Sequence, residues 1–96
     1  MNEAGTPHVE FTTRFNKQRK AAPLEIKLAL REAIALFLEH QSHRTLRNHA
    51  LRRKFTGYRS IDVTGDWRAL FRIKQFKTKT LVVFDFLGTH KQLYGK

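Results

Sequence analysis

Histidines and carboxylates are the side chains of this 96-residue chain that can carry protons in a reaction near neutral pH. The chain has five histidines and no cysteine, so disulfides and thiolate metal sites are excluded. His40 and His43 are spaced so that they could bracket a cation, but no third ligand of suitable type is near, and we expect a solvated pair at a helix end. The sequence also lacks a nucleophile elbow, a phosphate-binding glycine loop and a dinucleotide-binding fingerprint. The chemistry that remains is acid–base catalysis without a metal.

RNA cleavage is a reaction for which such side chains suffice. The ribose 2′-OH already lies beside the phosphate, so a general base can remove its proton while a cation stabilises the pentacoordinate phosphorane. A general acid then protonates the leaving 5′-oxygen, and histidine can do either task because it titrates near neutral pH. Two titratable groups and an arginine therefore make a site that fits a chain of this length.

The charge of the chain predicts a polyanionic or acidic partner. Nineteen Lys and Arg against eight Asp and Glu give a formal net charge of +11, which repels itself unless a partner neutralises it. Nucleic acid is the first expectation, and a basic surface kept for solubility is the alternative. No apolar run approaches the roughly 18 residues of a membrane-spanning helix, and the first residues lack the pattern of a signal peptide. We therefore expect a cytoplasmic protein without membrane attachment.

The basic residues are concentrated in two stretches without acids. Residues 40–61 and 67–84 contain no Asp or Glu, and their Lys and Arg alternate with aromatic residues, which suits single-stranded RNA because cations hold phosphates and rings stack on bases. The RNA-binding candidates in these stretches are Arg52, Arg53, Lys54, Arg59, Trp67, Arg68 and Arg72. Arg59 has a structural alternative as the partner of Asp62 or Asp66. Arg68 has one as the partner of Asp85.

The hydrophobic pattern predicts the elements that must position these candidates. Alternation predicts a strand over residues 9–12, and helical spacing predicts helices over 14–20 and 23–40. A basic loop over 40–55 with a short helical turn leads to strands at 58–63, 67–74 and 81–87, followed by a tail from 88 to 96 that has no element of its own. This order is an α+β fold in which an antiparallel sheet packs on a layer of two helices. We expect a flexible N-terminal arm over residues 1–7 and a single domain over residues 8–96.

The pattern also predicts which faces are buried. The apolar stripe that we expect helix 23–40 to turn to the core consists of Leu24, Leu28, Ala35 and Leu38, widened by Ile34 and Phe37. Along strand 67–74, alternation places Trp67, Ala69, Phe71 and Ile73 on one face. Phe71 and Ile73 are predicted core residues. Trp67 lies beside a turn and is as consistent with RNA contact as with packing.

Three segments of the sequence resemble one family of small bacterial toxins. Residues 57–73, GYRSIDVTGDWRALFRI, resemble the central hairpin of RelE/StbE-family toxins, in particular of their YafQ-like branch. Residues 87–95, LGTHKQLYG, resemble the Gly-Thr-His ending of that branch, and His49-Ala50-Leu51 matches the His-Pro-Leu that precedes its hairpin. The order of strand, two helices and three strands is also the family's architecture. The resemblance covers residues 8–96 and implies a single RelE-like toxin domain.

The resemblance implies the toxin component of a type II toxin–antitoxin system. Such a toxin is an endoribonuclease that cleaves mRNA in the ribosomal A site without metal or cofactor. The implied partners are mRNA, the ribosome and a cognate acidic antitoxin, with promoter DNA bound only by the toxin–antitoxin complex. By resemblance, His49, Asp66 and His90 fall on acid–base positions. Trp67 and Tyr94 fall on aromatic positions beside the site, and Trp67, Tyr94 or Phe86 is expected to bind RNA by stacking on bases.

Two residues depart from the YafQ-like pattern. Asp62 stands where that branch has a catalytic histidine, and it could orient a neighbouring histidine or act as a base itself. Phe86 stands where the branch has an arginine, so transition-state stabilisation is reduced unless Arg68 substitutes. Arg68 falls where RelE-like members place a phosphate-holding arginine directly after an aromatic residue.

These departures leave two alternatives to an active ribonuclease. One is an RNA- or ribosome-binding relative whose catalysis has decayed, which the residues at positions 62 and 86 permit. Such a protein would bind RNA in a salt-sensitive manner without cleaving it. The other is an inhibitor of DNA gyrase like the related ParE branch, which does not carry the Gly-Thr-His ending. An assay of gyrase supercoiling separates the second alternative from the ribonuclease.

Overall fold

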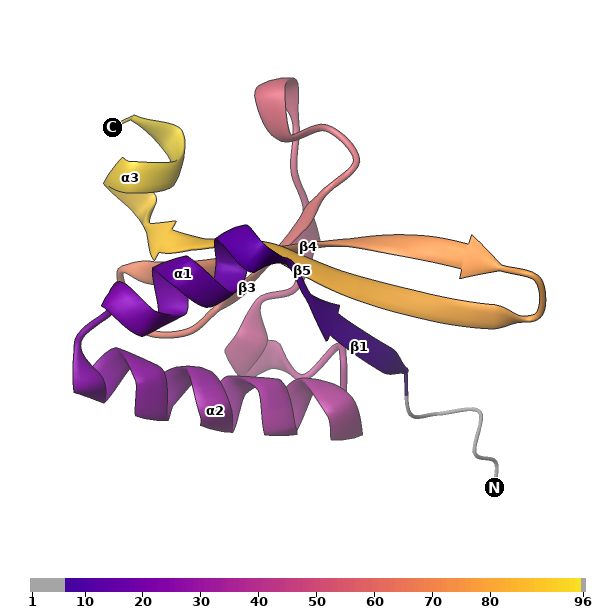
Figure 1. Ribbon diagram of the computed structural model, residues 1–96, viewed down its shortest axis with the longest axis horizontal. Coiled ribbons are helices and arrows are strands. Elements are labelled where there is room, and N and C mark those ends of the chain that lie inside the picture. Colours follow the sequence, from indigo (N-terminus) through magenta and orange to yellow (C-terminus); the bar gives the residue numbers. More distant parts are fainter. Residues whose placement is uncertain (1–6, 96) are drawn as a thin grey trace.

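The computed structural model describes residues 7–95, which form one five-stranded sheet, three α-helices and two short 3-10 helices (Figure 1). In chain order the elements are β1 (His8–Phe11), α1 (Thr13–Ala21), α2 (Leu24–Glu39), η2 (Arg44–Leu46), β2 (His49–Ala50), η3 (Arg53–Phe55), β3 (Arg59–Asp62), β4 (Trp67–Phe76), β5 (Lys79–Thr89) and α3 (His90–Tyr94). The expected α+β class is confirmed, as is the order of strand, two helices and meander. The arm predicted over residues 1–7 lies, apart from its last residue, outside the described residues.

The strands lie in the order β1-β5-β4-β3-β2, so the predicted meander forms the centre of the sheet. The pairs from β2 to β5 are antiparallel, and β1 adds a parallel pair with β5, which the crossover through two helices makes possible. β2 was not predicted, because His49 and Ala50 are too few for alternation to show. Their pairing with Ser60 and Arg59 of β3 defines the strand.

The first helix begins and ends where the sequence places capping residues. The hydroxyl of Thr12 accepts a hydrogen bond from the Phe15 N–H, which satisfies one of the unpaired donors of the first turn of α1. Pro23 separates α1 from α2, and its fixed backbone suits the start of the second helix. α1 lies along β5 beyond the end of β1, and the Gln18 side chain accepts a hydrogen bond from the Leu87 N–H at 2.7 Å.

The face of α2 that packs on the sheet differs from the predicted one. Ile26, Leu30, Ala33 and Phe37 are buried, whereas Leu24 is 68% exposed and Leu28 is 48% exposed. The expected stripe is confirmed at Phe37 but was wrong at Leu24, Leu28 and Ala35, because LEIKLALREAIALFLE has apolar residues almost all round the helix. Helical periodicity then offers two overlapping stripes, and packing against the sheet selects one of them. No helix formed by residues 7–95 is long and apolar enough to cross a membrane.

The main core lies between the two helices and one face of the sheet (Figure 1). Its aromatic centre is Phe15, Phe37, Phe71 and Phe84, and the Phe71 and Phe84 ring centroids are 5.1 Å apart. Phe71 is buried as predicted, but Ile73 is 46% exposed. The prediction for Ile73 was wrong because the β4–β5 hairpin projects beyond the helix layer, so alternation continues without a partner surface.

A β-bulge in β5 produces a second core on the opposite face of the sheet. Leu70 pairs with Phe86 and Phe71 pairs with Phe84, so Asp85 has no partner in β4. An extra residue shifts the alternation, so Phe86 lies in the second core whereas Phe84 lies in the main core. Phe86 packs there against Phe55 and Leu70.

The C-terminal segment, predicted to have no element, forms the short helix α3 on this second core. Thr89 and Gln92 form a reciprocal capping box, and Gly95 ends the helix in the left-handed conformation with φ of +77°. Leu93 is buried against the second core. At Gly88 an added Cβ would lie 3.0 Å from the Gln92 Oε1, so glycine allows the helix to approach β5. The prediction failed because five residues are too few to show helical periodicity.

Candidate active site

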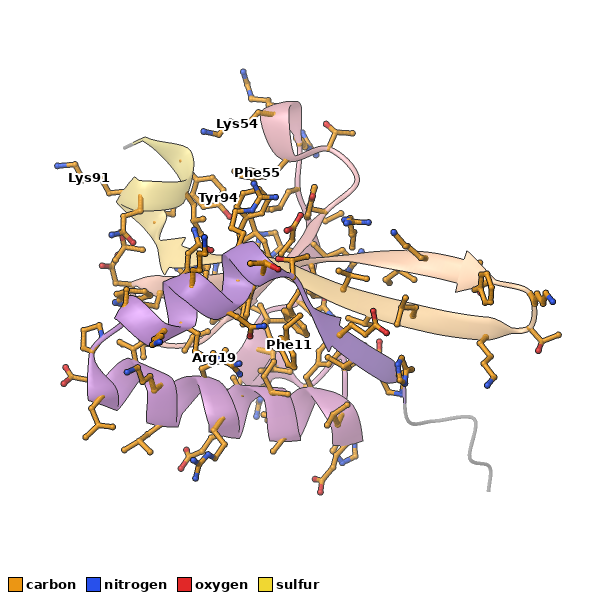
Figure 2. All side chains as sticks on the ribbon, in the orientation of Figure 1. Phe11, Arg19, Lys54, Phe55, Lys91 and Tyr94 are labelled. Carbon is orange, nitrogen blue, oxygen red and sulfur yellow. The ribbon has the colours of Figure 1, made fainter. Side chains whose placement is uncertain are left out.

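A cleft of about 350 Å³ brings together both predicted histidines and the predicted arginine. Its lining residues are Arg47, His49, Leu51, Arg68, His90 and Tyr94, which come from the end of η2, from β2 and the segment after it, from β4 and from α3. α3 and the η3 loop stand on the sheet face opposite α1 and α2 (Figure 1). Tyr94 lies on α3 where it faces Phe55 of the η3 loop, with the two ring centroids 5.8 Å apart (Figure 2).

The imidazole of His49 is held in one tautomer by the backbone. Its Nδ1 lies 2.7 Å from the carbonyl oxygen of Arg47. A carbonyl can only accept, so Nδ1 carries the proton, and in the neutral ring Nε2 has the lone pair. His49 is exposed at the end of the sheet, and its Nε2 is therefore suited to take a proton from a ligand.

His90 is positioned by the backbone of Asp66 and by Tyr94. The His90 N–H donates a hydrogen bond of 2.9 Å to the carbonyl oxygen of Asp66, which joins the start of α3 to the β3–β4 turn. The imidazole packs edge-on against Tyr94, one turn along the helix, with ring centroids 4.7 Å apart. Asp66 thus contacts the site through its carbonyl, and its side chain is exposed in the turn.

A carboxylate lies behind the two arginines of the cleft. Asp62 Oδ1 is 3.1 Å from Arg68 Nε, and Asp62 Oδ2 is 3.6 Å from Arg47 Nε. The Arg68 side chain is only 13% exposed, and its Nη1 donates to the carbonyl oxygens of Thr64, Gly65 and Trp67. Its Nη2 donates no hydrogen bond within residues 7–95, so this one corner of a rigidly held guanidinium can bind a ligand oxygen. The alternative that paired Arg68 with Asp85 was wrong, because Arg68 pairs with Asp62.

Arg59 is hydrogen-bonded to the loop that contains Arg47 and His49. Its Nε donates a hydrogen bond of 2.8 Å to the side-chain oxygen of Asn48, between Arg47 and His49. The alternative that paired Arg59 with Asp62 or Asp66 was therefore wrong. Arg47 itself has positive φ of +47°, and this turn points the chain from η2 into β2.

Residues 7–95 match the family model described as the bacterial toxin of a type II toxin–antitoxin system, YafQ. The chain belongs to this YafQ toxin family. The resemblance seen in the hairpin and in the Gly-Thr-His ending is thereby confirmed. Among curated proteins, none matches the sequence significantly.

Solved structures share the fold. YafQ from Escherichia coli strain BL21(DE3) superposes with a TM-score of 0.74 at 24% identity, covering 93% of this chain and 99% of that chain. The RelBE2 toxin–antitoxin complex from Mycobacterium tuberculosis contains a chain with a TM-score of 0.69 at 27% identity, covering 88% and 99%. A chain of the E. coli DinJ–YafQ toxin–antitoxin complex has a TM-score of 0.66 at 22% identity, covering 94% and 99%.

In this YafQ-family chain Phe86, for which the resemblance led us to expect an arginine, belongs to an aromatic cluster. The ring of Phe86 packs edge-on with Phe55 and Tyr58, and the Arg14 guanidinium lies 4.0 Å from its centroid. Phe86 is thus half-buried and occupied by neighbours, which leaves it little surface for stacking on a base. Its place in the second core follows from the bulge at Asp85, which the sequence pattern does not reveal.

Asp85 is the charged centre of this cluster. Its Oδ2 accepts a hydrogen bond of 2.6 Å from Tyr58, and its Oδ1 lies 3.0 Å from Arg14 Nη2, while Arg72 Nε is 3.9 Å away. Burial by itself raises the pKa of Asp85, but hydrogen bonds, that from Tyr58 foremost, outweigh it and hold the pKa below the ordinary 3.8. Burial and the bond to Asp85 raise the pKa of Tyr58 above 10.0. Arg72 is therefore tied to a structural ion pair.

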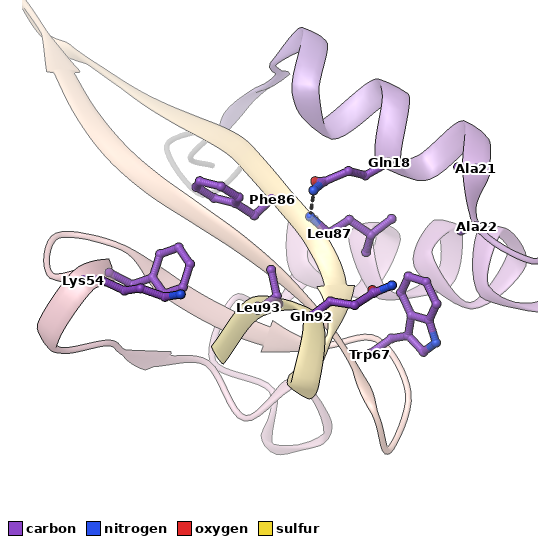
Figure 3. Close-up of a pocket in the computed structure, with 10 residues that line it drawn as sticks. Gln18, Ala21, Ala22, Lys54, Trp67, Phe86, Leu87, Gln92 and Leu93 are labelled. Carbon is purple, nitrogen blue, oxygen red and sulfur yellow. Dashed lines mark hydrogen bonds between the residues drawn. The ribbon is translucent and has the colours of Figure 1, made fainter. Parts of the chain in front are cut away.

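The other predicted RNA-binding residues lie outside the histidine cleft. Arg52, Arg53 and Lys54 are exposed on the η3 loop. Trp67 lines a second cleft of about 510 Å³ on another side of α3, which Figure 3 shows. His40 and His43 are exposed after α2, as expected, and His43 Nδ1 accepts the Thr45 N–H.

Arg47 and Leu51 are the cleft residues that sequence reasoning missed. Both lie within two residues of His49, in the stretch without acids, so that stretch was the available signal. The signal does not single out Arg47 among its neighbours, because only the turn at its positive φ and the approach of Asp62 from β3 place it at the cleft.

Proposed function

We propose that this YafQ-family toxin is a metal-independent endoribonuclease that cleaves mRNA in the ribosomal A site. The observation that supports it is the single cleft shared by two histidines and two arginines, of which Arg68 is fixed by Asp62 and three carbonyls. This set supplies a base, an acid and cations, the groups that transfer of a phosphate to the neighbouring 2′-oxygen requires.

His49 is the general base in this proposal. Its Nε2 takes the proton of the 2′-OH, and the 2′-oxygen attacks phosphorus to give a pentacoordinate phosphorane whose extra negative charge faces Arg68 Nη2 and Arg47. The bond from phosphorus to the 5′-oxygen then breaks, leaving a 2′,3′-cyclic phosphate. His90 gives its proton to the departing 5′-oxygen. Tyr94 holds the His90 ring edge-on and offers a flat surface beside it.

Asp62 and Asp66 act as positioning residues in this proposal. The Asp62 carboxylate lies against both arginines, so it fixes the phosphate-binding groups in place of the catalytic histidine that the family resemblance leads one to expect. Asp66 acts through its carbonyl, which holds the start of α3. Electrostatic stabilisation by fixed groups is most effective because they need not reorganise during the reaction.

A cognate acidic antitoxin is the proposed protein partner. The E. coli YafQ relative has been solved in complex with DinJ, and the M. tuberculosis relative in the RelBE2 complex. In this chain a formal charge of +11 calls for a partner of opposite sign. Binding to promoter DNA is proposed for the toxin–antitoxin complex alone.

The test adds purified protein to translating ribosomes with a defined mRNA and maps the new 5′ ends. We expect cuts within A-site codons, reduced at least about 100-fold in His49→Ala and in His90→Ala because each removes one proton-transfer group. His43→Ala is the matched control, since His43 is an exposed histidine outside the cleft.

Two results would redirect the assignment. Undiminished cleavage by the double His49→Ala, His90→Ala variant would refute the acid–base roles. Tight ribosome binding without any cleavage by the unaltered protein would favour the non-cleaving relative, and a gyrase supercoiling assay would follow.

A further inference from the structure

The second cleft beside α3 is lined by aromatic rings and by the side-chain amides of two glutamines (Figure 3). It is lined by Gln18, Ala21, Ala22, Lys54, Phe55, Trp67, Phe86, Leu87, Gln92 and Leu93. A volume of about 510 Å³ accommodates a group larger than any single side chain. Lys54 adds a positive charge to its rim, and no acidic residue lines it among the described residues.

The two glutamines of this cleft are oriented by backbone donors. Gln18 Oε1 accepts the Leu87 N–H at 2.7 Å, and Gln92 Oε1 accepts the Thr89 N–H at 2.9 Å. A backbone N–H can only donate, so the atom that accepts from it in each glutamine is the amide oxygen. The other atom of each side-chain amide is then the NH₂ group, which can donate. Neither NH₂ group donates a hydrogen bond within residues 7–95. In Figure 3 the Gln92 side chain extends toward Trp67.

Trp67 is the one cleft aromatic whose ring faces are not taken by a neighbouring ring or cation within the described residues. Phe55 and Phe86 pack against each other and beneath Lys54 and Arg14, respectively. The indole N–H of Trp67 also donates no hydrogen bond within residues 7–95. Trp67 is half-buried and packs against the main core, and the part of its indole that lines the cleft is a surface on which a nucleobase can stack.

The histidine cleft and this second cleft are adjacent, and residues of β4 and α3 line both of them. Trp67 directly precedes Arg68 at the start of β4, and Gln92 follows His90 by two residues on α3. Trp67 pairs in register with Thr89, the residue before His90. Trp67 and Arg68 are successive residues of β4 and point to opposite faces of the sheet, so an RNA strand with its phosphate at Arg68 has to pass round the start of β4 to bring a flanking nucleotide to Trp67.

We propose that the second cleft binds a nucleobase that flanks the cleaved phosphate, stacked on Trp67 and selected by the Gln18 and Gln92 amides, with guanine preferred. This rests on the proposed ribonuclease function. The donors of the cleft match a base edge that offers only acceptors, and guanine presents O6 and N7 side by side. Adenine and cytosine present an amino group on the same edge, which faces donors without an acceptor.

Binding of short 2′-fluoro oligonucleotides tests the proposal without cleavage, because they lack the attacking 2′-OH. One position at a time is made abasic to locate the selected nucleotide, and the four bases are then compared there. We expect one position at which loss of the base weakens binding about ten-fold, as for a base stacked on an aromatic side chain. At that position guanine should bind most tightly.

Gln92→Glu is the decisive variant. Glutamate still accepts the Thr89 N–H and is favoured in a capping box, so α3 is retained while an NH₂ donor becomes an acceptor. In this variant, oligonucleotides with adenine or cytosine at the selected position should bind more tightly than the one with guanine. Gln75→Glu adds the same charge on exposed β4 and should lower affinity for all bases alike, without changing their order.

Trp67→Ala should make the abasic and guanine oligonucleotides bind equally. Phe76→Ala is its control, because Phe76 is an aromatic residue 67% exposed at the far end of the β4–β5 hairpin. The proposal is overturned if no abasic position weakens binding, or if Gln92→Glu keeps the order of the unaltered protein. Failure of the ribonuclease function is seen separately, as absence of cleavage on ribosomes.

Discussion

Asp62 and Asp66 are two carboxylates whose neighbourhoods assign them different tasks. Asp62 is 15% exposed between Arg47 and Arg68, whereas Asp66 offers the site its carbonyl and exposes its side chain. The family pattern leads one to expect a proton donor or acceptor at both positions. From these contacts we predict that Asp62 holds the two arginines and that the Asp66 carboxylate is dispensable.

Substitution by asparagine separates these two tasks. Asp62→Asn keeps the shape but removes the charge that fixes Arg68 and Arg47, so we expect the cleavage rate to fall about ten-fold, the effect of a displaced charge-assisted contact. Asp66→Asn keeps the backbone carbonyl and should retain nearly full activity. Single-turnover cleavage with both variants measures this. A loss of about 100-fold in Asp66→Asn would instead assign its carboxylate to proton transfer.

At the scale of elements, α3 depends on its capping box and carries His90 into the cleft. Thr89→Ala removes the hydroxyl that accepts the Gln92 N–H, and we expect about 1 kcal/mol of helix stability to be lost. Because His90 is the first residue of α3, we expect the cleavage rate to fall by a larger proportion than the free energy of unfolding of the whole protein. Amide exchange at α3 and cleavage assays measure the two effects. Thr78→Ala, in the exposed turn between β4 and β5, is the control and should change neither.

The cluster around Asp85 links α1, the residue before β3, and the strands β4 and β5, and it makes stability depend on pH at both extremes. The pKa of Asp85 is lower in the folded state, so its contribution is complete above the ordinary value of 3.8 and is lost as the pH falls through the lower folded pKa. The pKa of Tyr58 is higher in the folded state, so its contribution is complete below 10.0 and is lost as the pH rises through the folded value.

Chemical denaturation across pH tests both contributions. Asp85→Asn should cost about 2 kcal/mol at neutral pH, the scale of hydrogen bonds to a charged group. The difference from the unaltered protein should shrink below pH 3.8 as Asp85 is protonated. Tyr58→Phe should converge with the unaltered protein above pH 10.0. A difference that does not change with pH would show that packing, not charge, accounts for the loss.

At the scale of the whole molecule, the positive charge predicts RNA binding that weakens with salt. Arg52, Arg53 and Lys54 are exposed on the η3 loop beside the clefts. Replacing all three by glutamine should reduce the slope of log affinity against log salt by about 2, because each phosphate contact to a single strand contributes about 0.7. The same change at Lys74, Lys77 and Lys79, on the projecting hairpin, should alter the slope less. Equal changes would place RNA along the hairpin as well.

The sequence by itself determined the order of the longer elements, from β1 through α1 and α2 to β3, β4 and β5, together with the basic character and the family. These follow from patterns within one segment, such as the alternation in β4, the proline before α2 and the Gly-Thr-His ending. The same local patterns brought His49, His90 and Arg68 forward as site residues, and the structure places all three in one cleft.

Only the tertiary structure decided which surfaces face one another. The buried face of α2, the bulge at Asp85 and the docking of α3 depend on partners distant in the chain, so no pattern within a segment contains them. The bulge turns Phe86 toward Phe55 and builds the second core under α3. That core separates the histidine cleft from the cleft at Trp67, because α3 stands on it between the two.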